Sequence, residues 1–184
     1  MAQPALAVEL APRHPTGLAL RNPVLVASGT FGRDGYGAGA MDLPQTQQLG
    51  AVFAKTTTLE ARKGNPLPRI AHGPGWMLNS IGLQNPGIDA VIQEHAPRWA
   101  NWETPVILSI TAERLEDFSK IAAIAQNAPG ISGLEVNVSC PNVVGGLDFG
   151  QSPETAAAVT ASVRAATSLP VIVKLTPNVT DIVA

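Results

Sequence analysis

The stretch PVILSITAERLEDFSKIAAIAQNAPGISGLEVN, residues 105–137, contains a strand, a helix and a second strand in direct succession. Its first five residues form a short apolar run that ends in a serine, which predicts a buried strand. Residues 115–128 then place Leu115, Phe118 and Ile121 on one helical face, and residues 134–137 form another short strand. A helix between two apolar strands is typical of a parallel α/β fold.

The same alternation extends toward both ends of the chain. Three more apolar runs predict strands, at residues 23–27, 51–55 and 171–175. Two more helical patterns follow, at residues 88–99 and 152–167. The second of these helices begins with a capping serine and a proline, which is favoured at the first position of a helix.

This order of strands and helices fits two architectures, an open doubly wound sheet and a (β/α)8 TIM barrel. A complete barrel usually needs about 250 residues, and five strands fill only part of one. We therefore expect residues 1–184 to form the N-terminal part of a single domain whose remaining strands follow Ala184. The predicted strands end in polar or ionisable residues, where such folds place their chemistry.

The composition excludes several classes of function. Of the 184 residues 45% are hydrophobic, and the net charge is −2. Lysine and arginine form no cluster, so neither nucleic acid nor a membrane surface is an expected partner. No apolar run reaches the roughly eighteen residues of a membrane span. Cys140 is the single cysteine, which excludes a disulfide within the chain and favours a reducing cytoplasm. The three scattered histidines predict no metal site.

The segment NVSCPN, residues 137–142, is the strongest candidate for chemistry because it follows the fourth predicted strand directly. It places the thiol of Cys140 between the carboxamides of Asn137 and Asn142. A thiolate can abstract a proton where its surroundings favour ionisation, and two carboxamides can hold a polar ring by paired donors and acceptors. A lone cysteine is more often a buried loop residue, but the flanking asparagines and the position at a strand end favour a function.

The longer segment EVNVSCPN, residues 135–142, closely resembles the active-site segment of class 1 dihydroorotate dehydrogenases. The class 2 enzymes are similar but carry serine at the position of Cys140. Further segments match the same family in the same order along the chain. They are NP at 22–23, ASGTFG at 27–32, KTTTLE at 55–60, GNP at 64–66, PRI at 68–70 and MLNSIGLQNPG at 77–87.

The resemblance implies an FMN-dependent oxidation of (S)-dihydroorotate to orotate in de novo pyrimidine (UMP) biosynthesis. Cys140 would be the catalytic base that removes the C5 proton, and FMN would accept the hydride from C6. The implied cofactor-binding residues are Ala27, Ser28, Gly29, Lys55, Thr56, Asn137 and Lys174. The implied substrate-binding residues are Lys55, Asn79, Ile81, Gly82, Leu83, Asn137 and Asn142. The FMN phosphate is expected on loops after later strands.

Two loops indicate the branch of the family. GLQNPG at residues 82–87, and Gly145-Gly146 followed by Phe149-Gly150, resemble the NAD-linked class 1B catalytic subunits rather than the fumarate-linked 1A enzymes. That branch implies a homo-oligomer and an electron-transfer subunit that carries FAD and an iron–sulfur cluster. One position departs from the pattern: Ser109 ends the third strand where we expect an asparagine that contacts the flavin.

Three other functions are alternatives to dihydroorotate oxidation. The pyrimidine-reducing FMN domain of dihydropyrimidine dehydrogenase uses a similar asparagine–cysteine loop. A non-catalytic half-barrel could bind flavin or a partner without turnover, although the intact set of Lys55, Asn79, Cys140 and Lys174 argues against it. A cysteine hydrolase is disfavoured because no histidine stands in a recognisable relation to Cys140. Residues 1–184 alone are expected to be inactive.

Overall fold

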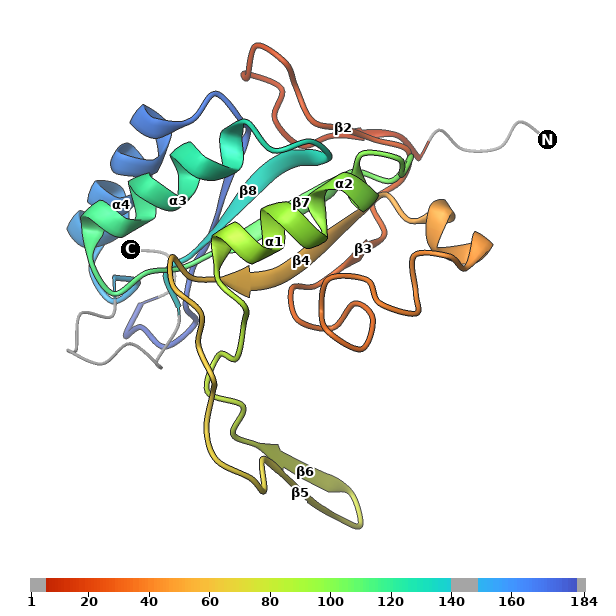
Figure 1. Ribbon diagram of the computed structural model, residues 1–184. Coiled ribbons are helices and arrows are strands. Elements are labelled where there is room, and N and C mark those ends of the chain that lie inside the picture. Colours follow the sequence, from red (N-terminus) through yellow and green to blue (C-terminus); the bar gives the residue numbers. More distant parts are fainter. Residues whose placement is uncertain (1–5, 140–148, 182–184) are drawn as a thin grey trace.

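The centre of the molecule is a parallel sheet whose strands follow one another in space in the order of the chain (Figure 1). The computed structural model describes residues 6–139 and 149–181. The five strands are β3 (Leu25–Val26), β4 (Ala51–Thr57), β7 (Val106–Ile110), β8 (Ile131–Asn137) and β9 (Val171–Lys174). A doubly wound sheet reverses its strand order at a switch point, and this sheet does not. It has the order of the first part of a (β/α)8 barrel, which confirms that prediction.

Helices cover the outer face of the sheet (Figure 1). They are α1 (Ile88–Glu94), α2 (Ala96–Trp99), α3 (Leu115–Gln126) and α4 (Pro153–Ala166). Phe118 of α3 and Val159 of α4 are fully buried in one apolar cluster with Leu108, Leu134 and Val136 of the strands. Burying this shared apolar surface is what holds the helices on the sheet.

The inner face of the sheet is apolar only near the amino ends of its strands. There Ala51, Phe53 and Ile107 form a second cluster with Leu18 and Leu20. Leu20 belongs to an antiparallel hairpin of β1 (Val8–Glu9) and β2 (Ala19–Leu20). The hairpin therefore covers the amino-terminal half of the inner face and leaves the carboxyl ends of the strands to polar residues.

Helix positions agree with the sequence except at residues 88–99, where two helices replace the single one expected. Helix α1 ends at Glu94, and α2 starts at Ala96 with Pro97 in its first turn. Proline has no N–H for a helical hydrogen bond, so the first helix cannot continue through it. The expected start of α4 is confirmed, because the Ser152 hydroxyl accepts a hydrogen bond from the backbone N–H of Thr155 at 3.4 Å.

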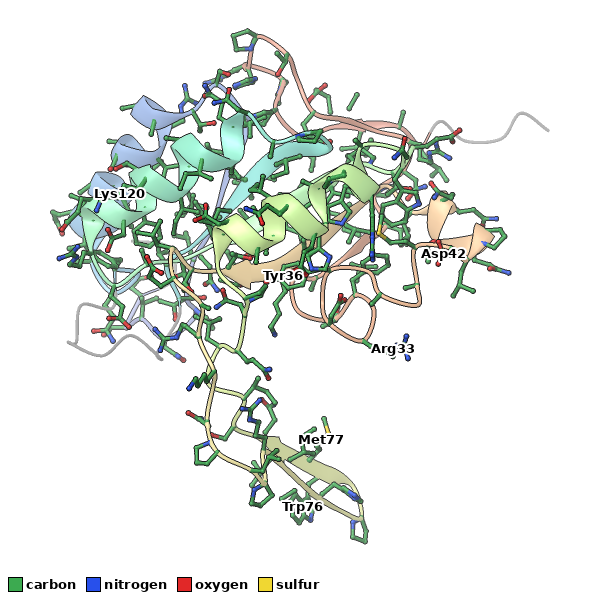
Figure 2. The ribbon with its side chains drawn as sticks, viewed as in Figure 1. Arg33, Tyr36, Asp42, Trp76, Met77 and Lys120 are labelled. Carbon is green, nitrogen blue, oxygen red and sulfur yellow. The ribbon has the colours of Figure 1, made fainter. Side chains whose placement is uncertain are left out.

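The molecule also has two antiparallel hairpins that are not predicted from the sequence. The second, of β5 (Ile70–Gly73) and β6 (Trp76–Asn79), forms an arm that projects from the body of the molecule (Figures 1 and 2). Trp76 lies on this arm and is 52% exposed. The arm leads back to the sheet through residues 79–87.

Candidate functional site

A cavity of about 460 Å³ lies where the carboxyl ends of the strands meet the base of the arm. Every described residue that the sequence implied as a ligand contact lines this cavity, except Ala27. Ser80 also lines it and was not foreseen. The lining residues are Ser28, Gly29, Lys55, Thr56, Asn79, Ser80, Ile81, Gly82, Leu83, Asn137 and Lys174.

Three of the residues that the sequence implied as site residues are not among those that line the cavity in the described part of the chain. Ala27 shapes the loop after β3 instead of lining the cavity, because its carbonyl accepts hydrogen bonds from the N–H and the hydroxyl of Thr30. Cys140 and Asn142 lie outside the described residues. Ser139 is the last described residue before them, and it is tied to Asn137.

A β-bulge brings two consecutive side chains of β4 to the cavity. Between the paired positions Ala54 and Thr57, β4 carries two residues where β7 carries only Ser109. In a regular strand successive side chains point to opposite faces, but a bulge interrupts that alternation. Lys55 and Thr56 therefore both line the cavity.

Lys55 is a half-buried cation with no counter-ion in the described part of the chain. Its backbone N–H donates to the carbonyl of Gly35 at 2.9 Å, which fixes the strand beside the loop after β3. No hydrogen bond or ion pair of its ammonium group joins it to another described residue, and burial lowers its pKa. An unpaired ammonium group in a cavity is suited to an anionic ligand.

Lys174 stands at the equivalent end of β9 but is paired. Its ammonium nitrogen lies 3.0 Å from Oε1 of Glu135 and 3.2 Å from Oγ of Ser28. Glu135 is almost completely buried, and it stands two residues before Asn137 on the same face of β8. Because this carboxylate balances Lys174, the net positive charge of the cavity comes from Lys55.

The amide of Asn137 is held on two sides. Its Oδ1 accepts from the backbone N–H of Ser139 at 3.2 Å and from the Ser139 hydroxyl at 2.8 Å. Its Nδ2 donates to Oγ1 of Thr56 at 3.3 Å, and Thr56 in turn lies 2.8 Å from Oγ of Ser109. Asn137 thus reaches the cavity with its orientation already set.

The loop from Asn79 to Leu83 is anchored from both neighbouring segments. Asn65 donates to the hydroxyl of Ser80 at 2.7 Å, and its backbone N–H donates to the carbonyl of Ile81 at 3.0 Å. Asn85 donates to the carbonyl of Leu83 at 2.9 Å. Leu83 has a φ of 55°, a left-handed conformation that a leucine rarely adopts and that is typical of functional loops.

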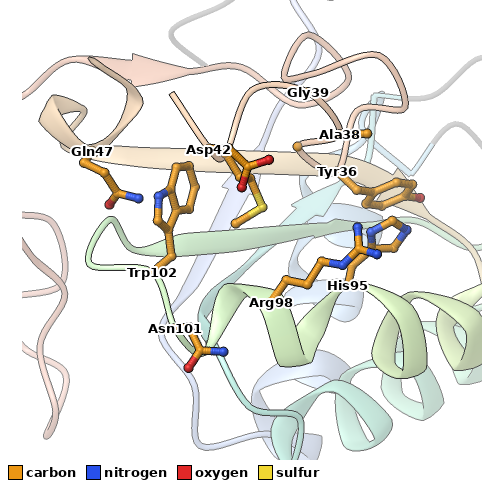
Figure 3. Close-up of a pocket in the computed structure, with 11 residues that line it drawn as sticks. Tyr36, Ala38, Gly39, Asp42, Gln47, His95, Arg98, Asn101 and Trp102 are labelled. Carbon is orange, nitrogen blue, oxygen red and sulfur yellow. The ribbon is translucent and has the colours of Figure 1, made fainter. Parts of the chain in front are cut away.

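A separate cavity of about 310 Å³ lies between the segment before β4 and the helices α1 and α2 (Figure 3). Tyr36, Asp42, His95, Arg98 and Trp102 are among its lining residues. It contains none of the residues that the sequence marked. Trp102 precedes β7, so this hollow borders the amino end of that strand, whereas α/β folds bind ligands at the carboxyl ends.

Sequence reasoning missed two polar residues behind the cavity. Glu135 was part of the quoted motif but received no role, although its spacing of two from Asn137 in a strand would have placed both on one face. Ser109 was noted only as a departure from the family pattern. The bulge that gives Ser109 its neighbours has no clear signal in the sequence.

The described residues contain neither a metal-binding cluster nor a membrane-spanning helix. Among them, no group of three or more histidine, cysteine, aspartate or glutamate side chains is arranged to hold a metal ion. No helix within residues 6–139 and 149–181 is both long and apolar enough to cross a bilayer.

Comparison with known proteins matches nearly the whole chain to one family. The family model described as dihydroorotate dehydrogenase matches residues 12–184. The "Dihydroorotate dehydrogenase B (NAD(+)), catalytic subunit" of Geotalea daltonii is 48% identical over 184 residues, which are 100% of this chain and 58% of that protein. The protein of the same name from Desulforudis audaxviator is 50% identical over 167 residues, or 90% of this chain and 53% of the relative.

One solved structure extends the comparison to the fold. The crystal structure of DHODH in complex with ferulenol from Eimeria tenella has a TM-score of 0.75 and 19% sequence identity. The match covers 97% of this chain and 54% of that one, and at this identity it supports the fold alone. The chain spans little more than half the length of the relatives that it matches. Since the family model covers residues 12–184, the chain belongs to the dihydroorotate dehydrogenase family.

Proposed function

We propose that this chain forms part of an FMN-dependent enzyme that oxidises (S)-dihydroorotate to orotate in de novo pyrimidine biosynthesis. The observation that carries the proposal is the unpaired ammonium group of Lys55 in the cavity at the strand ends. Both the substrate and a reduced flavin are anionic, so a cation between them stabilises both. The cavity also contains the fixed carboxamide of Asn137, which suits a planar heterocycle.

The residues of the cavity fit a flavin and a pyrimidine side by side. When bound, FMN would accept the hydride from the substrate. Ser28, Gly29, Thr56 and Lys174 would hold the flavin ring from the ends of β3, β4 and β9. The loop with Asn79, Ile81, Gly82 and Leu83, together with Asn142, would hold the pyrimidine. Lys55 and Asn137 would contact both ligands.

Cys140 is the proposed catalytic base. It would remove the C5 proton of dihydroorotate, because a thiol has an ordinary pKa of about 8.5 and can ionise near neutral pH where its surroundings favour the thiolate. The preceding residue, Ser139, is held to Asn137 by two hydrogen bonds.

The proposed electron acceptor is NAD, reached through a second subunit. Relatives at 48% and 50% identity are named as the NAD(+) type and as catalytic subunits, which suggests a non-catalytic partner. We propose that the partner carries FAD and an iron–sulfur cluster, that the catalytic chain forms a homo-oligomer, and that the assembly is cytoplasmic. The single cysteine of the chain suits that reducing compartment.

The test is flavin reduction in the purified protein that contains residues 1–184 and the rest of its barrel. Under anaerobic conditions dihydroorotate should bleach the flavin, whereas 5,6-dihydrouracil, which lacks the carboxylate, should act poorly. Cys140→Ser should slow the reduction by at least about a hundredfold, the contribution of a positioned general base, and should leave orotate binding intact. Efficient reduction by dihydrouracil, with none by dihydroorotate, would favour the dihydropyrimidine dehydrogenase alternative.

A further inference from the structure

Ser109 lies behind the candidate site and does not line it. It is fully buried in β7, the strand between β4 and β8. Thr56 of β4 and Asn137 of β8 belong to strands that are not neighbours, yet their side chains are hydrogen-bonded to each other at 3.3 Å. They can meet because the residue between them has one of the smallest side chains, and because the bulge turns Thr56 toward it.

The orientation of the Asn137 amide follows from the chemistry of its neighbours. A backbone N–H can only donate, so the atom of Asn137 that faces the N–H of Ser139 must be the oxygen. The nitrogen then faces Thr56 and donates one of its two hydrogens to Oγ1. The second hydrogen of the amide is left for a ligand.

Thr56 depends on Ser109 to complete this arrangement. Its Oγ1 accepts from Asn137 and shares a second hydrogen bond with Oγ of Ser109 at 2.8 Å, with all three side chains buried. A buried hydroxyl that loses a partner tends to rotate toward another, so the Ser109 hydroxyl restricts the rotamer of Thr56. The rotamer of Thr56 in turn fixes the direction of the second N–H of the Asn137 amide, the one left for a ligand.

We infer that Ser109 is a positioning residue that acts through Thr56 to aim an N–H of Asn137 at a ring carbonyl of the bound heterocycle. This inference rests on the proposed function and goes beyond it by assigning a role to a buried residue that does not line the cavity. It also explains how the site tolerates a serine where the family resemblance leads us to expect an asparagine. In place of a direct contact from residue 109, the hydrogen bonds from Ser109 through Thr56 orient Asn137.

The experiment measures orotate affinity by titration of the flavin absorbance in the complete protein. Ser109→Ala should raise the dissociation constant about fivefold, the equivalent of the roughly 1 kcal/mol that one net hydrogen bond contributes. The matched control is Thr104→Ala, which removes another buried hydroxyl, one that donates to the carbonyl of Thr46 at 3.4 Å just before β7. It should lower the melting temperature without changing orotate affinity.

A double-mutant cycle separates positioning from a general loss of stability. Thr56→Val keeps the shape of the side chain but removes the hydroxyl, and adding Ser109→Ala to it should weaken binding no further. Additive losses, or a Ser109→Ala protein that binds orotate as tightly as the wild type, would overturn the inference. The proposed function fails separately, if the wild-type flavoprotein neither binds orotate nor is reduced by dihydroorotate.

Discussion

Lys55 and Lys174 end their strands in the same way in the sequence, yet the fold gives them different surroundings. Lys174 shares its charge with the buried carboxylate of Glu135, whereas the ammonium group of Lys55 has no partner among the described residues. The sequence predicted both as site residues but could not tell them apart. That difference arises from a contact across β8 and β9, which no local pattern encodes.

Replacing Lys55 by alanine is expected to weaken orotate binding and to slow flavin reduction together, because one cation is proposed to serve both ring systems. Charge-assisted hydrogen bonds contribute about 1.5–3 kcal/mol, so each effect should be at least about tenfold. Orotate titration and stopped-flow reduction of the complete flavoprotein measure the two effects. If both the orotate affinity and the rate of flavin reduction were unchanged, Lys55 would be a solvated surface charge without a role in the site.

His95 connects stability to pH. Its ring is half-buried and stacks on Tyr36 with centroids 4.7 Å apart. Burial lowers its pKa from the usual 6.5, and Arg98 adds to this effect, although the carboxylates of Asp34 and Glu94 partly oppose it. The folded protein therefore binds a proton less readily than the unfolded chain does.

His95 should make the protein less stable as the pH falls below 6.5. Above pH 6.5 the ring is neutral in both states, and its contribution to stability is fully present. As the pH falls below 6.5, the unfolded chain takes up the proton first, so stability falls until the pH drops below the folded pKa. His95→Phe keeps a ring on Tyr36 and should lose this part of the pH dependence. Urea midpoints at pH 7.5 and 5.5 test it, and equal pH slopes for both proteins would contradict it.

At the scale of elements, the five strands and the helix cap at Ser152 could be predicted, because apolar runs and capping residues are local signals. The bulge in β4 could not. Strict alternation assigns Lys55 and Thr56 to opposite faces, and only the pairing with β7 reveals that both line the cavity. The arm was missed as well, although Gly73-Pro74-Gly75 between two short runs is a turn signal.

Gly35, in the loop after β3, lies against Lys55 and should therefore influence the position of the bulge in β4. This glycine has a φ of 84°, and a Cβ added to it would lie 2.7 Å from Cβ of Lys55. Gly75, at the tip of the arm, has a φ of 79° but no atom within 4 Å of an added Cβ. Gly75→Ala should therefore lower the free energy of unfolding by roughly 1–2 kcal/mol, the strain of a left-handed alanine alone.

Gly35→Ala should add to that strain a clash with Lys55, which lowers stability by roughly a further 1–3 kcal/mol. It should also weaken orotate binding, because Lys55 must shift, whereas Gly75→Ala should not. Urea unfolding and orotate titration of the two variants separate the effects. Equal stabilities for both variants would show that the loop yields without moving the strand.

At the scale of the whole molecule, the sheet has two free edges. Strands β3 and β9 each pair with one neighbour only within the described residues. Apolar side chains stand exposed at both edges, with Val24 59% and Leu175 64% accessible. A barrel removes such edges by closing on itself. We therefore expect further strands of a complete barrel to pair with β3 and β9.

A polypeptide of residues 1–184 alone is therefore expected to aggregate, to bind FMN weakly and to oxidise no dihydroorotate. Its edge strands would offer unpaired backbone groups to other chains, and the arm would add the exposed side chains of Ile70, Met77 and Leu78. The flavin contacts proposed for Lys55 and Lys174 would lack the phosphate anchor that barrels build after their later strands. Flavin absorbance retained through gel filtration, with dye-coupled turnover on the same fractions, measures all three properties. A monodisperse, yellow and active product would show that these residues close a complete domain by themselves.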